Sequence, residues 1–141
     1  MLQEAEKRIH LPNFRLPHFG YTFTQIYPDP EIDAKLQRIY QYWLTEFNYF
    51  MGFPYFFCDD LSEDVARQTG LKIAGGFFKT ELTPWPLGDL WRHTWCEDTE
   101  GRIVDLTVRQ FNLGLWLPHH FPKGVVIIEP DHPMRKRYEY T

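Results

Sequence analysis

Apolar side chains recur every three or four residues between Glu31 and Phe50, and this spacing predicts an amphipathic helix. The apolar positions are Ile32, Leu36, Ile39, Trp43, Phe47 and Phe50. Asp29 and Glu31 lie near the expected start, where acidic groups suit the positive end of the helix dipole. An aromatic stripe at this spacing is typical of a helix face that packs against a core.

A second, shorter helix is predicted from Asp59 to Thr69, with Leu61, Val65 and Ala66 facing inward and Gly70 just beyond its end. Asp60 is followed three residues later by Glu63, which resembles a capping box. That pattern would start the helix at Leu61 and leave Cys58 just outside its first turn.

Strand patterns dominate the rest of the chain. Residues 71–79 (LKIAGGFFK) predict a strand in which Gly75-Gly76 marks a bulge or a close backbone approach. Residues 91–106 predict a hairpin, with arms 91–97 and 102–106 and a turn at 98–101. Residues 80–89 predict a loop, residues 107–117 an irregular segment or one helical turn, and residues 124–129 (GVVIIE) a short buried strand. Helices followed by strands indicate an α+β fold, with helices packed on an antiparallel sheet.

The N-terminal part predicts little regular structure beyond a short helix in the first dozen residues. Prolines at 12, 17, 28 and 30 interrupt an aromatic stretch, so we expect residues 1–30 to form an extended arm on the domain. The arm could either pack on the domain or form one wall of a substrate groove, and packing is favoured. The length of 141 residues predicts a single domain, 1–141, with its core at 31–129.

Composition narrows the possible partners. The formal net charge of −4 argues against a general nucleic-acid surface. The charged N-terminus does not fit a secretory signal, and no apolar run is long enough to span a bilayer, so no membrane association is expected. Two cysteines do not make a disulfide framework, which favours a reducing, cytoplasmic setting. No trusted metal signature or cofactor motif is present, so we expect neither a metal nor a cofactor.

The chemically informative residues are Cys58, His93 and Asp105. They supply a nucleophilic thiol, an imidazole that moves the proton, and a carboxylate that orients the imidazole. On the predicted hairpin, His93 and Asp105 would lie on neighbouring strands within hydrogen-bonding reach. The alternatives are a buried cysteine and a core histidine, or a zinc site formed by the same three residues, which we rank lower.

Other residues take supporting roles. Strand alternation places Trp95 on the face of His93, where it would shield the imidazole, and sends Cys96 to the opposite face. Gln110 would hydrogen-bond a loop or contribute near the site, and the structural role is favoured.

These residues resemble the transglutaminase-like and papain-like cysteine enzyme superfamily. The resemblance covers residues 58–111 and rests on CDDLSEDVARQTGL, the strand KIAGGFF, the segment HTWCEDTEGRIVDLT and the following RQF. It is closest to small bacterial domains of this kind. It implies a papain-like or transglutaminase-like core with Cys58 as nucleophile, His93 as general base and then acid, and Asp105 as the residue that orients His93.

The chain departs from the family pattern around the nucleophile. Phe57, Asp59 and Asp60 flank Cys58 where small residues are common, so activation of Cys58 must come mainly from His93. No upstream Gln or Trp matches an oxyanion donor. The candidates are Asn48, Tyr55 and the backbone N–H of Cys58.

The expected function is a cysteine-dependent hydrolase or acyltransferase that acts on amide bonds through a thioester at Cys58. Its partner would be a peptide or protein substrate, with the bond in a peptide, an isopeptide or a glutamine side chain. Protease, deamidase and transglutaminase activities use the same triad and stay open, as does the oligomeric state. The alternative is a catalytically inactive binding or scaffolding module on the same fold.

Overall fold

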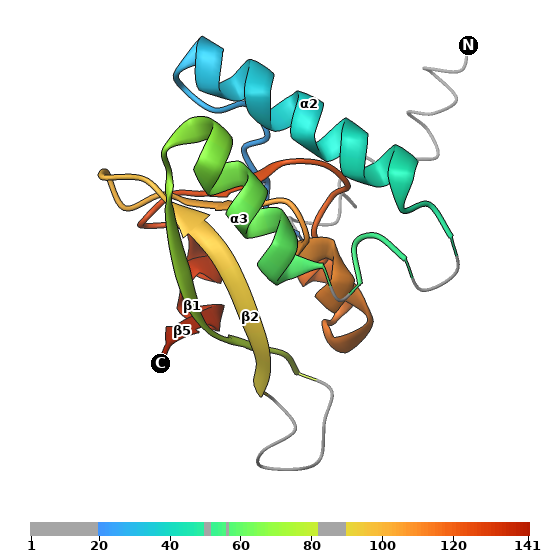
Figure 1. Ribbon diagram of the computed structural model, residues 1–141. Coiled ribbons are helices and arrows are strands. Elements are labelled where there is room, and N and C mark those ends of the chain that lie inside the picture. The colour runs from blue at the N-terminus through green and yellow to red at the C-terminus, as the bar shows by residue number, and fades with distance from the viewer. Residues whose placement is uncertain (1–19, 50–51, 56, 82–89) are drawn as a thin grey trace, which may run out of the picture.

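The computed structural model describes residues 20–49, 52–55, 57–81 and 90–141. In this part of the chain, helices pack on a five-stranded antiparallel sheet, which confirms the α+β prediction. Helices α2 and α3 lie together on one side of the sheet, and α3 runs along β2 (Figure 1). The predicted N-terminal helix, most of the arm and most of the 80–89 loop fall outside the described residues.

The strands are short apart from the first two. The helices are α2 Pro30–Glu46 and α3 Cys58–Thr69, with 3-10 helices η1 Val108–Gly114, η2 Leu117–His119 and η3 Pro133–Arg137. The strands are β1 Lys72–Lys79, β2 Leu90–Glu97, β3 Ile103–Asp105, β4 Val126–Ile128 and β5 Tyr138–Tyr140. In the sheet they follow the order β4-β3-β2-β1-β5.

Helix α2 begins where the sequence predicts. The Asp29 carboxylate accepts hydrogen bonds from the backbone N–H groups of Glu31 and Ile32, and Pro30 occupies the first turn, where its missing N–H costs nothing. The predicted end near Phe50 is wrong, because the helix stops at Glu46. The chain reverses there, and the N–H of Phe53 donates to the carbonyl of Phe47.

Helix α3 begins earlier than its capping-box pattern predicts. Its first residue is Cys58, and no side chain caps its start, so the prediction of a start at Leu61 is wrong. The first helical hydrogen bond runs from the N–H of Leu61 to the carbonyl of Phe57. Gly70 ends the helix at φ 81°, as predicted for a C-terminal glycine.

The predicted hairpin forms as β2 and β3. Their paired residues are Cys96 with Val104 and Glu97 with Ile103, and the Asp98 side chain accepts backbone hydrogen bonds across the turn. No pairing with β3 is recorded for the rest of β2 in the described residues, although β1 pairs along its whole length. The edge of β2 next to β3 is therefore open at His93.

The sheet separates two apolar cores. On the helix side, Leu36, Ile39, Leu61 and Val65 pack with sheet residues that include Cys96. The other side has no α-helix over it in the described residues. Its aromatic core residues come from the sheet, from η1 and from the loop after η2: Phe78, Trp95, Tyr138, Phe111 and Phe121.

Both ends of the described chain join the sheet. Thr24 forms a bridge with Ile127, so this part of the arm lies on the domain as predicted. Strand β5 pairs with β1, which extends the sheet beyond the predicted core limit at residue 129. Of the two glycines in β1, Gly76 provides the close approach, because a Cβ there would lie 1.9 Å from the carbonyl oxygen of Glu139. The unbroken β1–β2 register leaves no bulge at this point.

Within the described residues, no helix is long and apolar enough to cross a membrane.

The glycine pair offers a stability test. We expect Gly76→Ala to lower the free energy of unfolding by about 1–3 kcal/mol, since the added methyl group would push β5 away from β1. Gly75→Ala is the control, because its Cβ would meet only the carbonyl oxygen of His93 at 3.9 Å. Urea unfolding of both variants measures the difference, and equal stabilities would contradict the close approach.

Candidate active site

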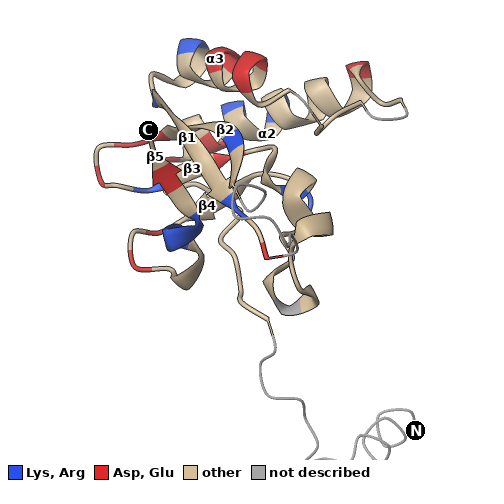
Figure 2. Cartoon of the chain, turned by 90° about the horizontal axis from the view of Figure 1, so that it is seen from below, with Lys and Arg blue, Asp and Glu red and all other residues tan. Residues whose placement is uncertain are grey.

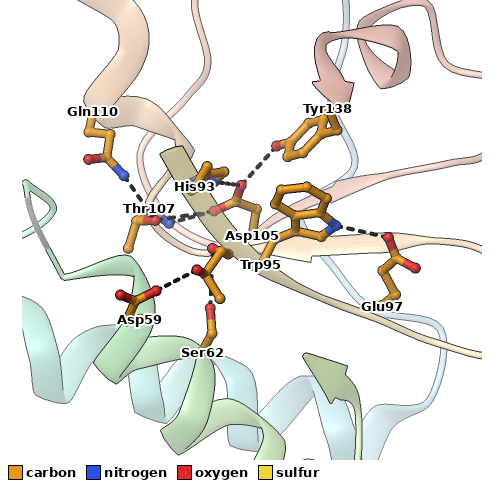
Figure 3. Close-up of polar contacts among 10 residues, drawn as sticks. Asp59, Ser62, His93, Trp95, Glu97, Asp105, Thr107, Gln110 and Tyr138 are labelled. Atoms are coloured by element: carbon orange, nitrogen blue, oxygen red, sulfur yellow. Dashed lines mark hydrogen bonds and ion pairs between the residues drawn. The ribbon is translucent and has the colours of Figure 1, made fainter. Parts of the chain in front are cut away.

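The site centres on a buried pair formed by His93 and Asp105. His93 Nε2 lies 2.6 Å from Asp105 Oδ2, and both side chains are almost completely buried (Figure 3). Continuing the β2–β3 register would set Asp105 opposite Trp95, so His93 is its diagonal neighbour on the same face. The hairpin therefore brings together two residues that the sequence separates by eleven others.

Asp105 is held by further hydrogen bonds. Tyr138 donates its hydroxyl to Oδ2 at 2.9 Å, and Thr107 donates its backbone N–H to Oδ1 at 3.0 Å and its hydroxyl at 3.3 Å. Gln110 Nε2 in turn donates to the Thr107 hydroxyl at 3.2 Å. With both oxygens occupied, the carboxylate has a single orientation and fixes the imidazole through Nε2.

Aromatic rings enclose the imidazole. Phe111 meets it edge to face with ring centroids 4.9 Å apart, and Trp95 lies beside it at 5.6 Å. Trp95 therefore shields the ring, as its position on the strand predicts. Among the described residues, the buried Nδ1 atom of His93 has no hydrogen-bond partner. A buried nitrogen without a partner is costly, so this atom marks a place where a partner is expected.

The charge of His93 is set by two opposing influences. Burial lowers the pKa of His93, but the charge and hydrogen bond of Asp105, assisted by the Cys58 side chain, outweigh it and raise the pKa from 6.5 to about 9. At neutral pH the ring is therefore an imidazolium, with Nε2–H directed to Asp105 and Nδ1–H left for another acceptor.

Cys58 reaches this region from the other side of the sheet. Helix α3 is tied to β2 because Thr94 donates its hydroxyl to Asp59, while Ser62 donates to the carbonyl of Thr94 at 3.3 Å (Figure 3). Cys58, the first residue of α3, directly precedes the residue tied to β2, and its side chain contributes to the raised pKa of His93. Its side chain is partly exposed, but no hydrogen bond joins it to His93 in this structure.

The first turn of α3 offers candidate oxyanion donors. Among the described residues, no hydrogen bond from the backbone N–H of Cys58 or of Asp59 is found. The same turn also carries the carboxylates of Asp59 and Asp60 (red on α3 in Figure 2). The hydroxyl of Thr94 donates a hydrogen bond to the Asp59 carboxylate. This bond keeps the Asp59 carboxylate directed at β2, which limits its approach to the Cys58 sulfur. Of the two side-chain candidates, Asn48 is exposed after α2, whereas Tyr55 lines a cavity beside the site.

That cavity has a volume of about 250 Å³ and lies at the end of β2 beyond His93. The residues that line it are Tyr55, Thr80, Trp91, Gln110, Phe111, Leu113 and Gly114. Phe111 forms both a wall of the cavity and the edge-to-face contact with His93. The cavity is therefore one side chain away from the imidazole.

The structure brings together most of the residues selected from sequence. His93, Asp105 and Trp95 share one face, Gln110 supports Asp105 through Thr107, and Cys96 lies on the opposite face beside Ser62. Sequence reasoning missed Thr107 and Tyr138. Thr107 follows Asp105 by two residues, so its hydrogen bonds to the carboxylate could have been predicted from the sequence. Nothing near Tyr138 indicated that β5 would bring its hydroxyl to the same carboxylate.

A zinc site formed by Cys58, His93 and Asp105 does not fit this geometry. Asp105 Oδ2 and His93 Nε2 point at each other, whereas metal ligands would point at a shared ion. Within the described residues, no group of three or more His, Cys, Asp or Glu side chains is arranged to hold a metal ion.

Comparison with known proteins found no family model, no curated protein and no solved structure that matches this chain.

The raised pKa of His93 predicts a pH-dependent stability. The folded state keeps the His93 proton up to about pH 9, whereas the unfolded state releases it near 6.5. The free energy of unfolding should therefore fall by about 3 kcal/mol as pH rises through this window. Denaturant unfolding at several pH values measures how the free energy of unfolding depends on pH. Subtracting the same curve for His93→Gln removes the contribution of the other titrating groups. An unchanged slope in His93→Gln would show that His93 is not the group responsible.

Tyr138 gives a second test of the buried network. Tyr138→Phe should lower the free energy of unfolding by about 1.5–3 kcal/mol, because the buried Asp105 carboxylate loses a hydrogen-bond donor. Tyr140→Phe is the control, since the Tyr140 hydroxyl binds Glu97 at the exposed end of β5. Thermal or urea unfolding compares the two, and a larger loss in Tyr140→Phe would contradict this assignment.

Proposed function

We propose that this protein is a cysteine-dependent hydrolase or acyltransferase that acts on amide bonds, with Cys58 as nucleophile, His93 as general base and acid, and Asp105 as the orienting carboxylate. The observation that carries the proposal is the state of His93: one ring nitrogen is held by Asp105, and the other is buried without a partner near Cys58. A resemblance of residues 58–111 to transglutaminase-like and papain-like enzymes points the same way.

The chemistry follows from this arrangement. In the reactive state the proton of Cys58 already resides on His93 Nδ1, and the thiolate sulfur beside the imidazolium attacks the amide carbonyl carbon to form a tetrahedral oxyanion. Backbone N–H groups at the start of α3 are the candidate donors for that oxyanion. The imidazolium then gives its proton to the leaving nitrogen, the C–N bond breaks, and a thioester remains on Cys58.

The second half-reaction decides the product. Attack by water, deprotonated by His93, releases a carboxylic acid and makes the protein a protease or deamidase. Attack by an amine forms a new amide and makes it a transglutaminase. A peptide or protein substrate fits all three outcomes. A reducing compartment such as the cytoplasm fits a free Cys58 thiol.

One observation favours a second candidate, a binding or scaffolding module without activity. No hydrogen bond joins Cys58 to His93, although catalytic contacts are often loose without substrate. A module would keep the buried pair for stability alone, and its Cys58 would be an ordinary thiol.

Thiol reactivity separates the two candidates. Iodoacetamide near neutral pH should label Cys58 quickly in the native protein, with the adduct mapped by mass spectrometry over a time course. Cys96 is an internal control, because it is buried and burial raises its pKa to about 12. In His93→Ala the Cys58 rate should fall by about 10²-fold, the lower end of the range for loss of general-base assistance.

Two further variants complete the design. Asp105→Asn should slow labelling less than His93→Ala does, because the ring stays in place without its orienting charge. Tyr140→Phe should label like the native protein. Labelling of Cys58 that is unaffected by His93→Ala would exclude the proposed triad and favour the module.

A further inference from the structure

The cavity lined by Tyr55, Trp91, Gln110, Phe111 and Leu113 has features of a substrate-binding pocket. It adjoins the imidazole through Phe111, and Tyr55 precedes Cys58 by three residues. A group seated there would hold its attached carbonyl near the thiol and the imidazole. No other described cavity is lined by a residue that contacts His93.

The lining is chemically selective. Among the described residues that line the cavity, none is Asp, Glu, Lys, Arg or His. The Thr80 hydroxyl accepts a hydrogen bond from Trp91 Nε1, and the Gln110 NH₂ group is bonded to Thr107, so part of the polar lining is already engaged. A charged group buried there would lose its hydration without gaining a counter-ion.

The size limits the occupant further. Pockets that bury a whole drug-sized ligand measure about 300–1,000 Å³, and an apolar cavity of about 150 Å³ holds one benzene molecule. At about 250 Å³ this cavity suits one side chain of the size of leucine or phenylalanine.

Resting on the proposed function, we infer that this cavity binds an uncharged, apolar side chain next to the scissile carbonyl, so that the substrate is a peptide amide of a leucine- or phenylalanine-like residue. A glutamine side chain would place a polar amide against the aromatic walls. The inference thus favours peptide hydrolysis over glutamine-directed transfer.

Two matched pairs of exposed side chains allow the cavity to be changed without disturbing the core. Leu113 and Leu117 are 80% and 77% exposed, and only Leu113 lines the cavity. Trp91 and Trp116 are 51% and 59% exposed, and only Trp91 lines it. Leu113→Asp and Trp91→Ala are therefore test variants, with Leu117→Asp and Trp116→Ala as their controls.

Binding is measured first, without any need for turnover. In the full-length Cys58→Ser protein, N-acetyl-leucine amide and N-acetyl-glutamine amide are titrated while NMR follows the Trp91 indole and Gln110 amide signals. We expect the leucine compound to saturate both signals and to bind about tenfold more tightly than the glutamine compound. Leu113→Asp should weaken the leucine compound, and Leu117→Asp should not.

Turnover is measured second, with peptide amides that differ only at this residue. Leucine and phenylalanine substrates should have kcat/KM values about tenfold or more above those of glutamine and glutamate substrates. Trp91→Ala should reduce that preference, whereas Trp116→Ala should preserve it.

The outcomes distinguish the pocket from the triad. Selective labelling of Cys58 together with equal or absent binding of the leucine and glutamine compounds overturns the pocket and leaves the proposed function standing. Saturable leucine binding with an unreactive Cys58 overturns the proposed function, and this apolar site would then belong to a binding module. Shifts at Trp116 in place of Trp91 would also overturn the pocket.

Discussion

The buried contact between His93 and Asp105 is the interaction on which the rest of this structure depends. Two ionisable side chains, both almost fully buried, are stable only as a pair with the remaining polar atoms satisfied. Tyr138, Thr107 and Gln110 satisfy the carboxylate side of the pair. On the imidazole side, Nδ1 has no partner within the part of the chain that the structure describes, and this difference favours a chemical site over a purely structural ion pair.

The sheet explains how such a site can form. Among the described residues, β2 and β3 pair only next to the turn, so the edge of β2 at His93 has no strand partner there. The first turn of α3 is anchored at this edge by Asp59 and Ser62. Cys58 therefore opens a helix that is held against β2 on one face of the sheet, while the His93 imidazole lies on the other face.

Much of this architecture could be predicted from local patterns. Period-two alternation in β2 separates His93 and Trp95 from Cys96, and the Asp98–Gly101 turn sets the register that makes His93 and Asp105 neighbours. The start of α2 next to Asp29 could also be predicted from the sequence. These features depend on residues that are close in sequence.

The features that were missed depend on contacts between distant segments. Helix α3 starts at Cys58 and not where the capping-box pattern of Asp60 and Glu63 predicts, and its first turn is bonded to the sheet through Asp59 and Thr94. Tyr138 reaches Asp105 only because β5 pairs with β1, where Gly76 permits the close approach. The cavity is lined by residues from the segment before α3, from β2 and from η1, so no single stretch of the sequence predicts it.

In the proposed mechanism, Cys58 and the Nδ1 atom of His93 act as one reactive unit. NMR of the His93 ring nitrogens, recorded before and after alkylation of Cys58, tests this most directly. We expect alkylation to change the Nδ1 signal much more than the Nε2 signal, since Nε2 stays bonded to Asp105. Ring signals that do not respond to the modified sulfur would contradict it.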